Sequence, residues 1–230
     1  MDNKDYIERI RHSCAHVLAQ AVKELYPEVK LGIGPVIENG FYYDFDNLDI
    51  KEEDLKKLEG KMNEIVKKDY KFELLRKSKK DAEKILKDEP YKLELLRDLK
   101  DGEITFYQDG SFIDLCKGPH VNSAKEIKAF KLTKIAGAYW KGDSKNKMLT
   151  RIYGVAFLNK DELNKYLINL QEAERRNHIK LGKQLNLFSF QEEGPGFPFW
   201  HPNGTIIYNE VVNFLRREYE KRNYKEIKTP

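Results

Sequence analysis

The spacing of apolar residues predicts helices in several parts of the chain. Between residues 4 and 26, apolar side chains recur every three or four positions, which is the spacing of one helical face, and Pro27 follows directly. The stretch that starts at Asn159 is charged on most sides, and Glu162 completes a capping box at its start. Further helices are predicted over residues 51–68, 79–87, 159–183 and 205–222.

Between these helices the pattern changes to short β-like runs. Asn39-Gly40 and Asp109-Gly110 are strong turn signals, and each is flanked by aromatic or β-branched residues. Strands are predicted within residues 30–46, 70–75, 104–115, 131–158 and 225–229. Helices and hairpins of this kind predict an α+β fold.

The same pattern predicts how the chain is divided. A long helix that is charged around much of its surface suits a link between two domains. We therefore expect a first domain over residues 1–158 and a linker helix over residues 159–183. Residues 184–230 are rich in aromatic residues, glycine and proline and end on a helix and a strand, which we interpret as the truncated opening of a second domain.

Composition narrows the class of protein. Charged residues are 35% of the chain, but the net charge is only +4, which is typical of a well-solvated protein with local charged patches. The two cysteines do not make a disulfide framework. The N-terminus lacks an apolar signal segment, and no run approaches the ~18 apolar residues of a membrane helix. We expect a cytoplasmic protein without a membrane partner.

His12 and His16 form the first candidate site. Residues four apart lie one above the other on a helix, and this pair lies on a face that we expect to differ from the apolar core face. Ala15 and Ala19 beside them leave room for a ligand. Packed core or surface histidines would look similar, and HxxxH without the glutamate of HExxH is a weak zinc signal.

A second candidate follows the predicted hairpin, where Asp114, Cys116 and His120 lie in a loop that Gly118-Pro119 keeps from being helical. A buried thiol and a surface histidine are the alternative interpretation. Cys14 differs, because it falls on the apolar stripe of its helix, and we expect it to pack in the core.

Together the two pairs supply three histidines and one cysteine. This is the ligand set of a tetrahedral zinc site, and it is equally a polar pocket that orients a water by general base chemistry. Spacing alone does not choose between them.

The segment that follows is strongly basic. The stretch from Lys117 to Arg151 contains nine lysines and arginines but only two acidic residues. This local excess of positive charge is larger than the net charge of the chain. Aromatic residues are interleaved, and this combination is typical of a site for a single-stranded nucleic-acid end. A solvated lysine-rich face is the alternative.

Several longer stretches resemble one family. RHSCAHVLAQA, GPVIENGFYYDFD, DLCKGPH and KLTKIAGAYWKGDSKNKMLTRIYGVAF are similar to the editing domain of bacterial-type threonyl-tRNA synthetases, the second additional domain shared with alanyl-tRNA synthetases. The resemblance continues through RRNHIKLGKQLNLFSFQEEGPGFPFWHPNG. It implies that residues 184–230 begin a class II catalytic domain, an antiparallel-sheet fold, with motif 1 at the dimer interface.

The resemblance also implies site residues. It places His12, His16, Cys116 and His120 in the editing pocket, with Asp114 and Lys92 as further catalytic candidates. One of the two helical histidines would activate a water, Asp114 would meet the substrate ammonium, and Lys92 would meet developing negative charge or the RNA. The substrate-binding residues that we expect are Tyr43, Tyr107, Lys134, Tyr139 and Trp140.

The implied activity is a second sieve. Losing one methyl group costs only about 1–3 kcal/mol of discrimination, so a threonine–tRNA ligase needs a site that hydrolyses seryl-tRNA(Thr) while excluding threonine. The expected partner is the 3′ end of tRNA(Thr). In the full-length homodimer, ATP, Mg²⁺ and one zinc ion are expected at sites beyond residue 230.

The editing pocket itself is expected to need no metal. The bacterial threonyl branch points that way, and four protein ligands would close a tetrahedral zinc and leave no position for water. If a metal were bound, its ligands would be His12, His16, Cys116 and His120. The alternative functions are a free-standing deacylase acting in trans, a non-catalytic tRNA-binding module and a generic zinc hydrolase.

Overall fold

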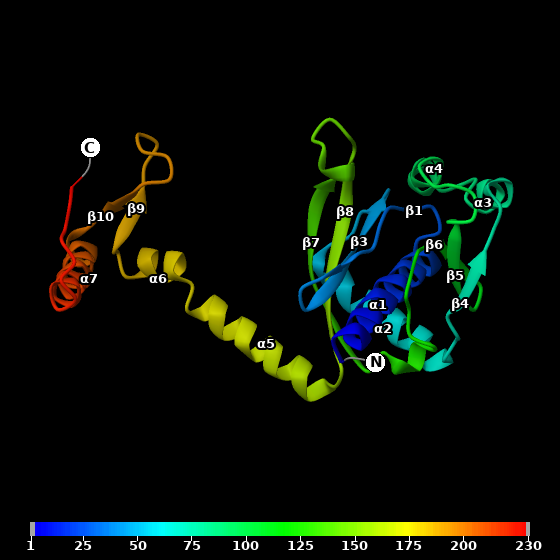
Figure 1. Cartoon of the computed structure of the whole chain (residues 1–230), viewed down its shortest axis with the longest axis horizontal. Coiled ribbons are helices and arrows are strands. Elements are labelled where there is room, and N and C mark those ends of the chain that lie inside the picture. Colours follow the sequence, from blue (N-terminus) through cyan, green and yellow to red (C-terminus); the bar gives the residue numbers. More distant parts are fainter. Residues whose placement is uncertain (1–2, 229–230) are drawn as a thin grey trace. The chain divides into compact units, whose positions relative to one another are not determined.

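The computed structural model describes residues 3–228, which form two compact units that meet between Tyr166 and Leu167. Figure 1 shows the helices and strands of both units. The fold is mixed α and β, and every strand pair described is antiparallel. The division lies inside a helix, and the domain limits inferred from the sequence stay predictions.

The first unit is built on a five-stranded sheet with the order β1-β3-β8-β7, to which β2 adds beside β3. Helices α1 and α2 pack together, and α1 contacts β3 and β8 while α2 contacts β7 (Figure 1). The elements are α1 (Asn3–Leu25), β1 (Lys30–Leu31), β2 (Val36–Ile37), β3 (Gly40–Asp46), a 3₁₀ turn (Glu52–Asp54), α2 (Leu55–Lys68), β7 (Ala129–Tyr139) and β8 (Met148–Phe157).

Side-chain alternation along β3 forms the core between this sheet and the helices. Phe41, Tyr43 and Phe45 are buried with the apolar residues of α1. The intervening Tyr42 points to the opposite face, because successive strand residues alternate. The predicted hairpin turn is present one residue earlier, at Glu38-Asn39, because Gly40 is already paired with Ile37 as the first residue of β3. Asn39 has a positive φ of 60°.

Helix α1 is buried on more sides than its apolar stripe predicts. Ser13, His16 and Gln20 are as buried as the apolar residues beside them. The expectation that the histidines lie away from the packed interior is wrong for His16, because aromatic rings of Phe72 and Phe112 pack edge-on against it. A second layer of structure therefore covers the polar side of the helix.

That layer is a smaller body with its own apolar cluster, formed by Ala82, Leu86, Leu96, Ile104 and Phe106. Its three-stranded sheet has the order β4-β5-β6. Its elements are β4 (Glu73–Arg76), α3 (Lys79–Ile85), α4 (Pro90–Arg97), β5 (Thr105–Asp109) and β6 (Phe112–Leu115), followed by a 3₁₀ turn (Ala124–Glu126). The pattern did not predict α4, which begins with a proline, a favoured residue of a first helical turn.

The second unit contains the end of α5 (Lys160–Arg175), then α6 (His178–Gln184), the hairpin of β9 (Phe188–Phe190) and β10 (Pro198–Trp200), and α7 (Pro202–Glu220). The single helix predicted over residues 159–183 is wrong, because α5 ends at Arg175 and the side chain of Asn177 caps the start of a separate helix, α6. The predicted strand near residue 225 is absent from the described residues, which stop at 228. Within residues 3–228 no helix is both long and apolar enough to span a membrane.

Candidate functional site

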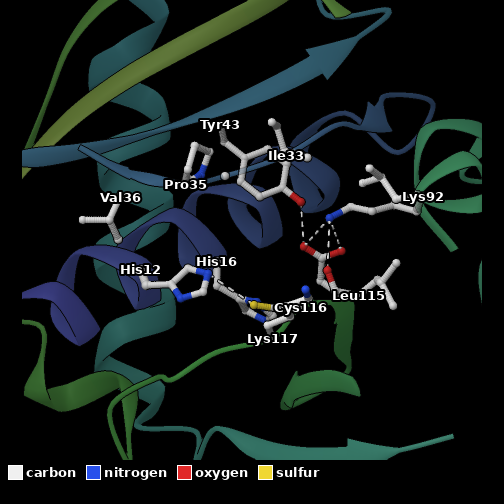
Figure 2. Close-up of a pocket in the computed structure, with 13 residues that line it drawn as sticks. His12, His16, Ile33, Pro35, Val36, Tyr43, Lys92, Leu115, Cys116 and Lys117 are labelled. Carbon is white, nitrogen blue, oxygen red and sulfur yellow. Dashed lines mark hydrogen bonds and ion pairs between the residues drawn. The ribbon is translucent and has the colours of Figure 1, made fainter. Parts of the chain in front are cut away.

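A cavity of about 390 Å³ lies where the two bodies of the first unit meet. Helix α1 and the segment around Pro35 form one side, and α4 and the end of β6 form the other (Figure 2). Its lining residues are His12, His16, Ile33, Gly34, Pro35, Val36, Tyr43, Lys92, Leu95, Asp114, Leu115, Cys116 and Lys117. Polar groups therefore converge on a wall that is otherwise apolar, as in most small-molecule sites.

Three of the predicted residues form a tight cluster at the wall of this cavity. Cys116 Sγ lies 3.2 Å from His12 Nε2 and 3.3 Å from His120 Nε2. The backbone amide of Gly118 donates to the same sulfur over 3.3 Å. The structure thus brings together residues 104 positions apart in the chain, one from a helix and two from a loop.

His120 is held from several directions. Its Nδ1 lies 3.0 Å from Ser13 Oγ, and this hydroxyl also accepts the amide of Val121. Phe72 stacks on the ring at 5.0 Å, and Tyr107 meets it edge-on at 4.4 Å. His120 does not line the cavity, so it supports the cluster from behind.

His16 makes a different contact. Its Nε2 lies 2.9 Å from Asp109 Oδ1, and both side chains are almost completely buried. The ring stands edge-on to that of His120 at 5.1 Å. His16 lines the cavity, but its Nε2 lies beside a carboxylate, and the residue does not join the cluster of His12, Cys116 and His120.

A buried ion pair occupies the other end of the cavity. Lys92 Nζ lies 2.7 Å from Asp114 Oδ1 and 3.0 Å from Oδ2, and the Tyr43 hydroxyl donates to Oδ2 over 2.6 Å (Figure 2). Lys92 and Asp114 are both buried. Such pairs persist in low dielectric only when the geometry and extra hydrogen bonds compensate the lost hydration, and here Tyr43 supplies one of those bonds.

Burial sets the protonation of the cluster. It lowers the pKa of His12 and of His120, in both cases mainly by desolvation, with nearby histidines adding to the effect. Burial raises the pKa of the Cys116 thiol to about 11. At neutral pH the site therefore holds two neutral imidazoles and a thiol, which makes Cys116 a poor nucleophile and leaves the imidazoles able to accept a proton or bind a metal.

Helix α4, which carries Lys92, is fastened to the larger body by several side-chain contacts. At its start, the carboxylate of Glu89 accepts Lys23 Nζ at 2.8 Å and the amide of Leu31 at 2.7 Å. Further along, Glu94 accepts the indole of Trp140 at 3.0 Å. These contacts fix the distance between Lys92 and the strand that carries Tyr43.

The predicted substrate-binding residues lie in different parts of the first unit. Tyr43 lines the cavity, and Tyr107 packs on His120. Trp140 is 4% exposed and clamps α4, so its ring offers no free surface to a base. Tyr139 is exposed near the end of β7, outside the cavity lining.

Lys134 lies on the other side of the sheet. Its Nζ is 4.6 Å from the ring of Tyr153, which packs against Tyr42. Because Tyr42 and Tyr43 are consecutive strand residues, they point to opposite faces. The basic and aromatic stretch therefore does not gather around the cavity as a whole, because strand alternation separates its members.

Three groups could hold a metal ion. Ligand atoms of His12, Cys116 and His120 lie within 4.8 Å of one another, and His16 does not join them. Three protein ligands with an open position are the arrangement of a catalytic zinc site. The expectation of a metal-free pocket stays a prediction, but the argument that four ligands would close the site loses its premise.

Sequence reasoning missed two side chains that support the cluster. Ser13 was hidden because a serine inside a helix has no distinctive pattern, although it stands between the two histidines. Asp109 was assigned to a turn, where aspartate is common for its own local reasons. The only sign that Asp109 has another role is that its charged side chain is fully buried, and burial is known only from the structure.

Part of the chain matches a known family model. Residues 104–153 match the family model described as the threonyl and alanyl tRNA synthetase second additional domain. The class defined by fold and site is thus that of a synthetase-associated domain.

The particular family follows from the whole chain. It is 54% identical to the threonine–tRNA ligase of Clostridium tetani, covering 100% of this chain and 36% of that protein. The corresponding ligase of Acetivibrio thermocellus is 51% identical over 100% of this chain and 37% of its own length. That of Caldanaerobacter subterraneus subsp. tengcongensis is 55% identical over 95% and 35%. The chain belongs to the threonyl-tRNA synthetase family, as its motifs predicted, and spans about a third of the length of these relatives.

Proposed function

We propose that the first unit hydrolyses the ester of serine mischarged on tRNA(Thr), as the editing component of a threonine–tRNA ligase. The observation that carries the proposal is the meeting of His12, Cys116 and the Lys92–Asp114 pair in one cavity. A water activator, a cation and a carboxylate are the groups that hydrolysis of an aminoacyl ester uses.

His12 is the best candidate for the general base. His120 does not line the cavity, and His16 directs its Nε2 to Asp109. His12 lines the cavity, and its lowered pKa keeps the imidazole neutral at working pH. The choice between the two helical histidines, which spacing left open, thus falls on His12.

The reaction needs no nucleophile other than water. His12 takes a proton from the water as its oxygen attacks the ester carbonyl, and the resulting imidazolium returns that proton to the departing ribose oxygen. Lys92 supplies positive charge for the oxygen that becomes negative. Asp114 Oδ1, which within residues 3–228 has Lys92 as its only ion-pair partner, keeps a lone pair for the substrate ammonium, and Tyr43 donates to its other oxygen.

The test is hydrolysis of seryl-tRNA(Thr) and of threonyl-tRNA(Thr) by the purified chain. We expect rapid hydrolysis of the seryl ester only, and a fall of about 10²–10⁴-fold in rate for His12→Ala, the typical contribution of a positioned base. His178→Ala, an exposed histidine of α6, is the matched control and should keep the full rate. A chain that binds tRNA without hydrolysing either ester would support the binding-module alternative.

Metal content is tested on the same protein. Elemental analysis and hydrolysis before and after chelation should show no stoichiometric metal and no loss of rate. Stoichiometric zinc whose removal abolishes hydrolysis would instead make His12, Cys116 and His120 ligands and would remove His12 from the role of base.

The wider activity is proposed from the relatives. Their name implies attachment of threonine to tRNA(Thr) with ATP, and we infer that residues 184–230 correspond to the start of a class II catalytic domain with motif 1. Exposed apolar side chains of α7, such as Phe214 and Ile207, support this reading because a motif 1 helix is covered in a homodimer. Size-exclusion chromatography with light scattering of the full-length ligase tests the dimer.

A further inference from the structure

Asp109 is the last residue of β5, directly before the hairpin turn, yet its side chain is fully buried. The carboxylate lies 2.9 Å from His16 Nε2, and within residues 3–228 it forms no other ion pair. An aspartate at a hairpin turn is ordinarily solvated. Burying a carboxylate costs several kcal/mol unless it is paired. We therefore expect the side chain under α1 to have a pairing group with a role in the site.

The surroundings of His16 show what the pairing does. The ring meets His120 edge-on at 5.1 Å, Phe112 at 4.9 Å and Phe72 at 5.5 Å. Aromatic edges and faces thus fix the plane of the imidazole but not which nitrogen carries the proton. A carboxylate facing one ring nitrogen settles this, as the partners of catalytic and metal-binding histidines do.

We infer that Asp109 is a positioning residue of the hydrolytic site, whose negative charge keeps the proton of His16 on Nε2, the ring nitrogen beside the carboxylate. His16 is then a fixed neighbour of His120 and stays out of the cluster of His12, Cys116 and His120. The catalytic part of this inference rests on the proposed function. The pairing itself does not, because it is visible without any substrate.

The consequence for rate follows from the geometry. Without the carboxylate, His16 can adopt the other tautomer, in which Nε2 carries a lone pair in place of the proton. His120 then loses a neighbour of fixed protonation. Removal of such an orienting partner typically costs 10–100-fold in activity. Asp109 does not line the cavity, so substrate binding should change little.

The first experiment uses the unaltered chain. Long-range ¹⁵N–¹H correlation spectra of the ¹⁵N-labelled protein at pH 7.5, assigned with His16→Gln, should show a protonated Nε2 on His16. An unprotonated Nε2 would overturn the inference. This result is independent of hydrolysis, so failure of the proposed function and failure of the pairing are distinguishable.

The second experiment measures seryl-tRNA(Thr) hydrolysis by variants. Asp109→Asn should lower kcat by 10–100-fold with KM within twofold of the starting value. In a His16→Gln background, Asp109→Asn should lower kcat no further, since a residue acting through another loses its effect with that partner. Additive losses, or an unchanged kcat, would overturn the inference.

Asp44→Asn is the matched control. Asp44 is an equally buried carboxylate, 2% exposed and paired with Arg151, but its side chain lies on the sheet face opposite Tyr43. This variant should lose thermal stability while keeping kcat. If Asp109→Asn behaved like it, with a lower unfolding temperature and unchanged kcat, Asp109 would be structural only and the inference would fail.

Discussion

The two units of the chain differ in whether their apolar side chains are buried. In the described part of the chain, every buried apolar side chain lies at or before Leu163. Of the large apolar side chains that are exposed, only Leu74, Tyr139 and Met148 precede the second unit, and all the others belong to residues 167–228. The second unit is as rich in Phe, Ile and Leu, so apolar content alone does not make a core. A core needs elements on both sides of each apolar face, as the sheet and helices of the first unit provide.

The largest test of this contrast is a pair of truncations to alanine. Phe45→Ala removes a fully buried ring from the first core and should lower the free energy of unfolding by about 3–5 kcal/mol. Phe214→Ala removes a ring of α7 that is 53% exposed and should change it by about 0.5 kcal/mol or less. Urea unfolding followed by circular dichroism measures both, and equal losses would contradict the contrast.

The next effect concerns the ion pair at the seam of the two bodies. Lys92→Met keeps the length of the side chain but leaves Asp114 buried without its cation, which should cost about 3 kcal/mol of unfolding free energy. Lys84→Met, an exposed lysine of α3, is the control and should be nearly neutral. A stable Lys92→Met chain would show that the seam does not depend on this pair.

A smaller effect should appear with pH. Since the pKa values of His12 and His120 are lower in the folded chain than the ordinary 6.5, the unfolded chain binds more protons in mildly acidic solution. Stability should therefore be full above pH 6.5 and should fall as pH drops below it, by up to about 1.4 kcal/mol per pH unit for each histidine. His12→Gln should reduce the slope between pH 6.5 and 5.5, whereas the exposed His178→Gln should keep it.

The smallest effect is expected from removing most of the second unit. A chain that ends at Arg175, the last residue of α5, should unfold within about 0.5 kcal/mol of the full chain, because no buried apolar residue is lost. It should also aggregate less, since it exposes fewer apolar side chains. A large loss of stability in chemical denaturation would mean that residues 176–228 support the first core.

The sequence was most informative where one local rule acts alone. The helical spacing of α1 and the turn signals at Asn39-Gly40 and Asp109-Gly110 predicted their elements, since each depends on neighbours in the chain. The prediction of one helix through Asn177 was wrong, because a side-chain cap outweighed the periodic pattern. Helix α4 has only eight residues, which is too short for a clear period.

For the site, the residue types and their spacing selected the histidines and the cysteine, but not what each one contacts. His16 pairs with Asp109, and His12 contacts Cys116. Both contacts depend on how the smaller body packs against α1. Likewise, Lys134 and Trp140 belong to a basic, aromatic stretch in the sequence, and only strand alternation and the contact with α4 separate them from the cavity. Such long-range placements have no counterpart in local pattern.

The burial of Trp140 against α4 affects the fluorescence of the chain. The chain has two tryptophans, Trp140 buried against α4 and Trp200 44% exposed in the second unit. A buried indole emits at shorter wavelength than a solvated one, so each unit carries its own fluorophore. In a Trp200→Phe chain the remaining emission comes from the indole bonded to Glu94, and any shift on adding seryl-tRNA would report movement of the helix that carries Lys92.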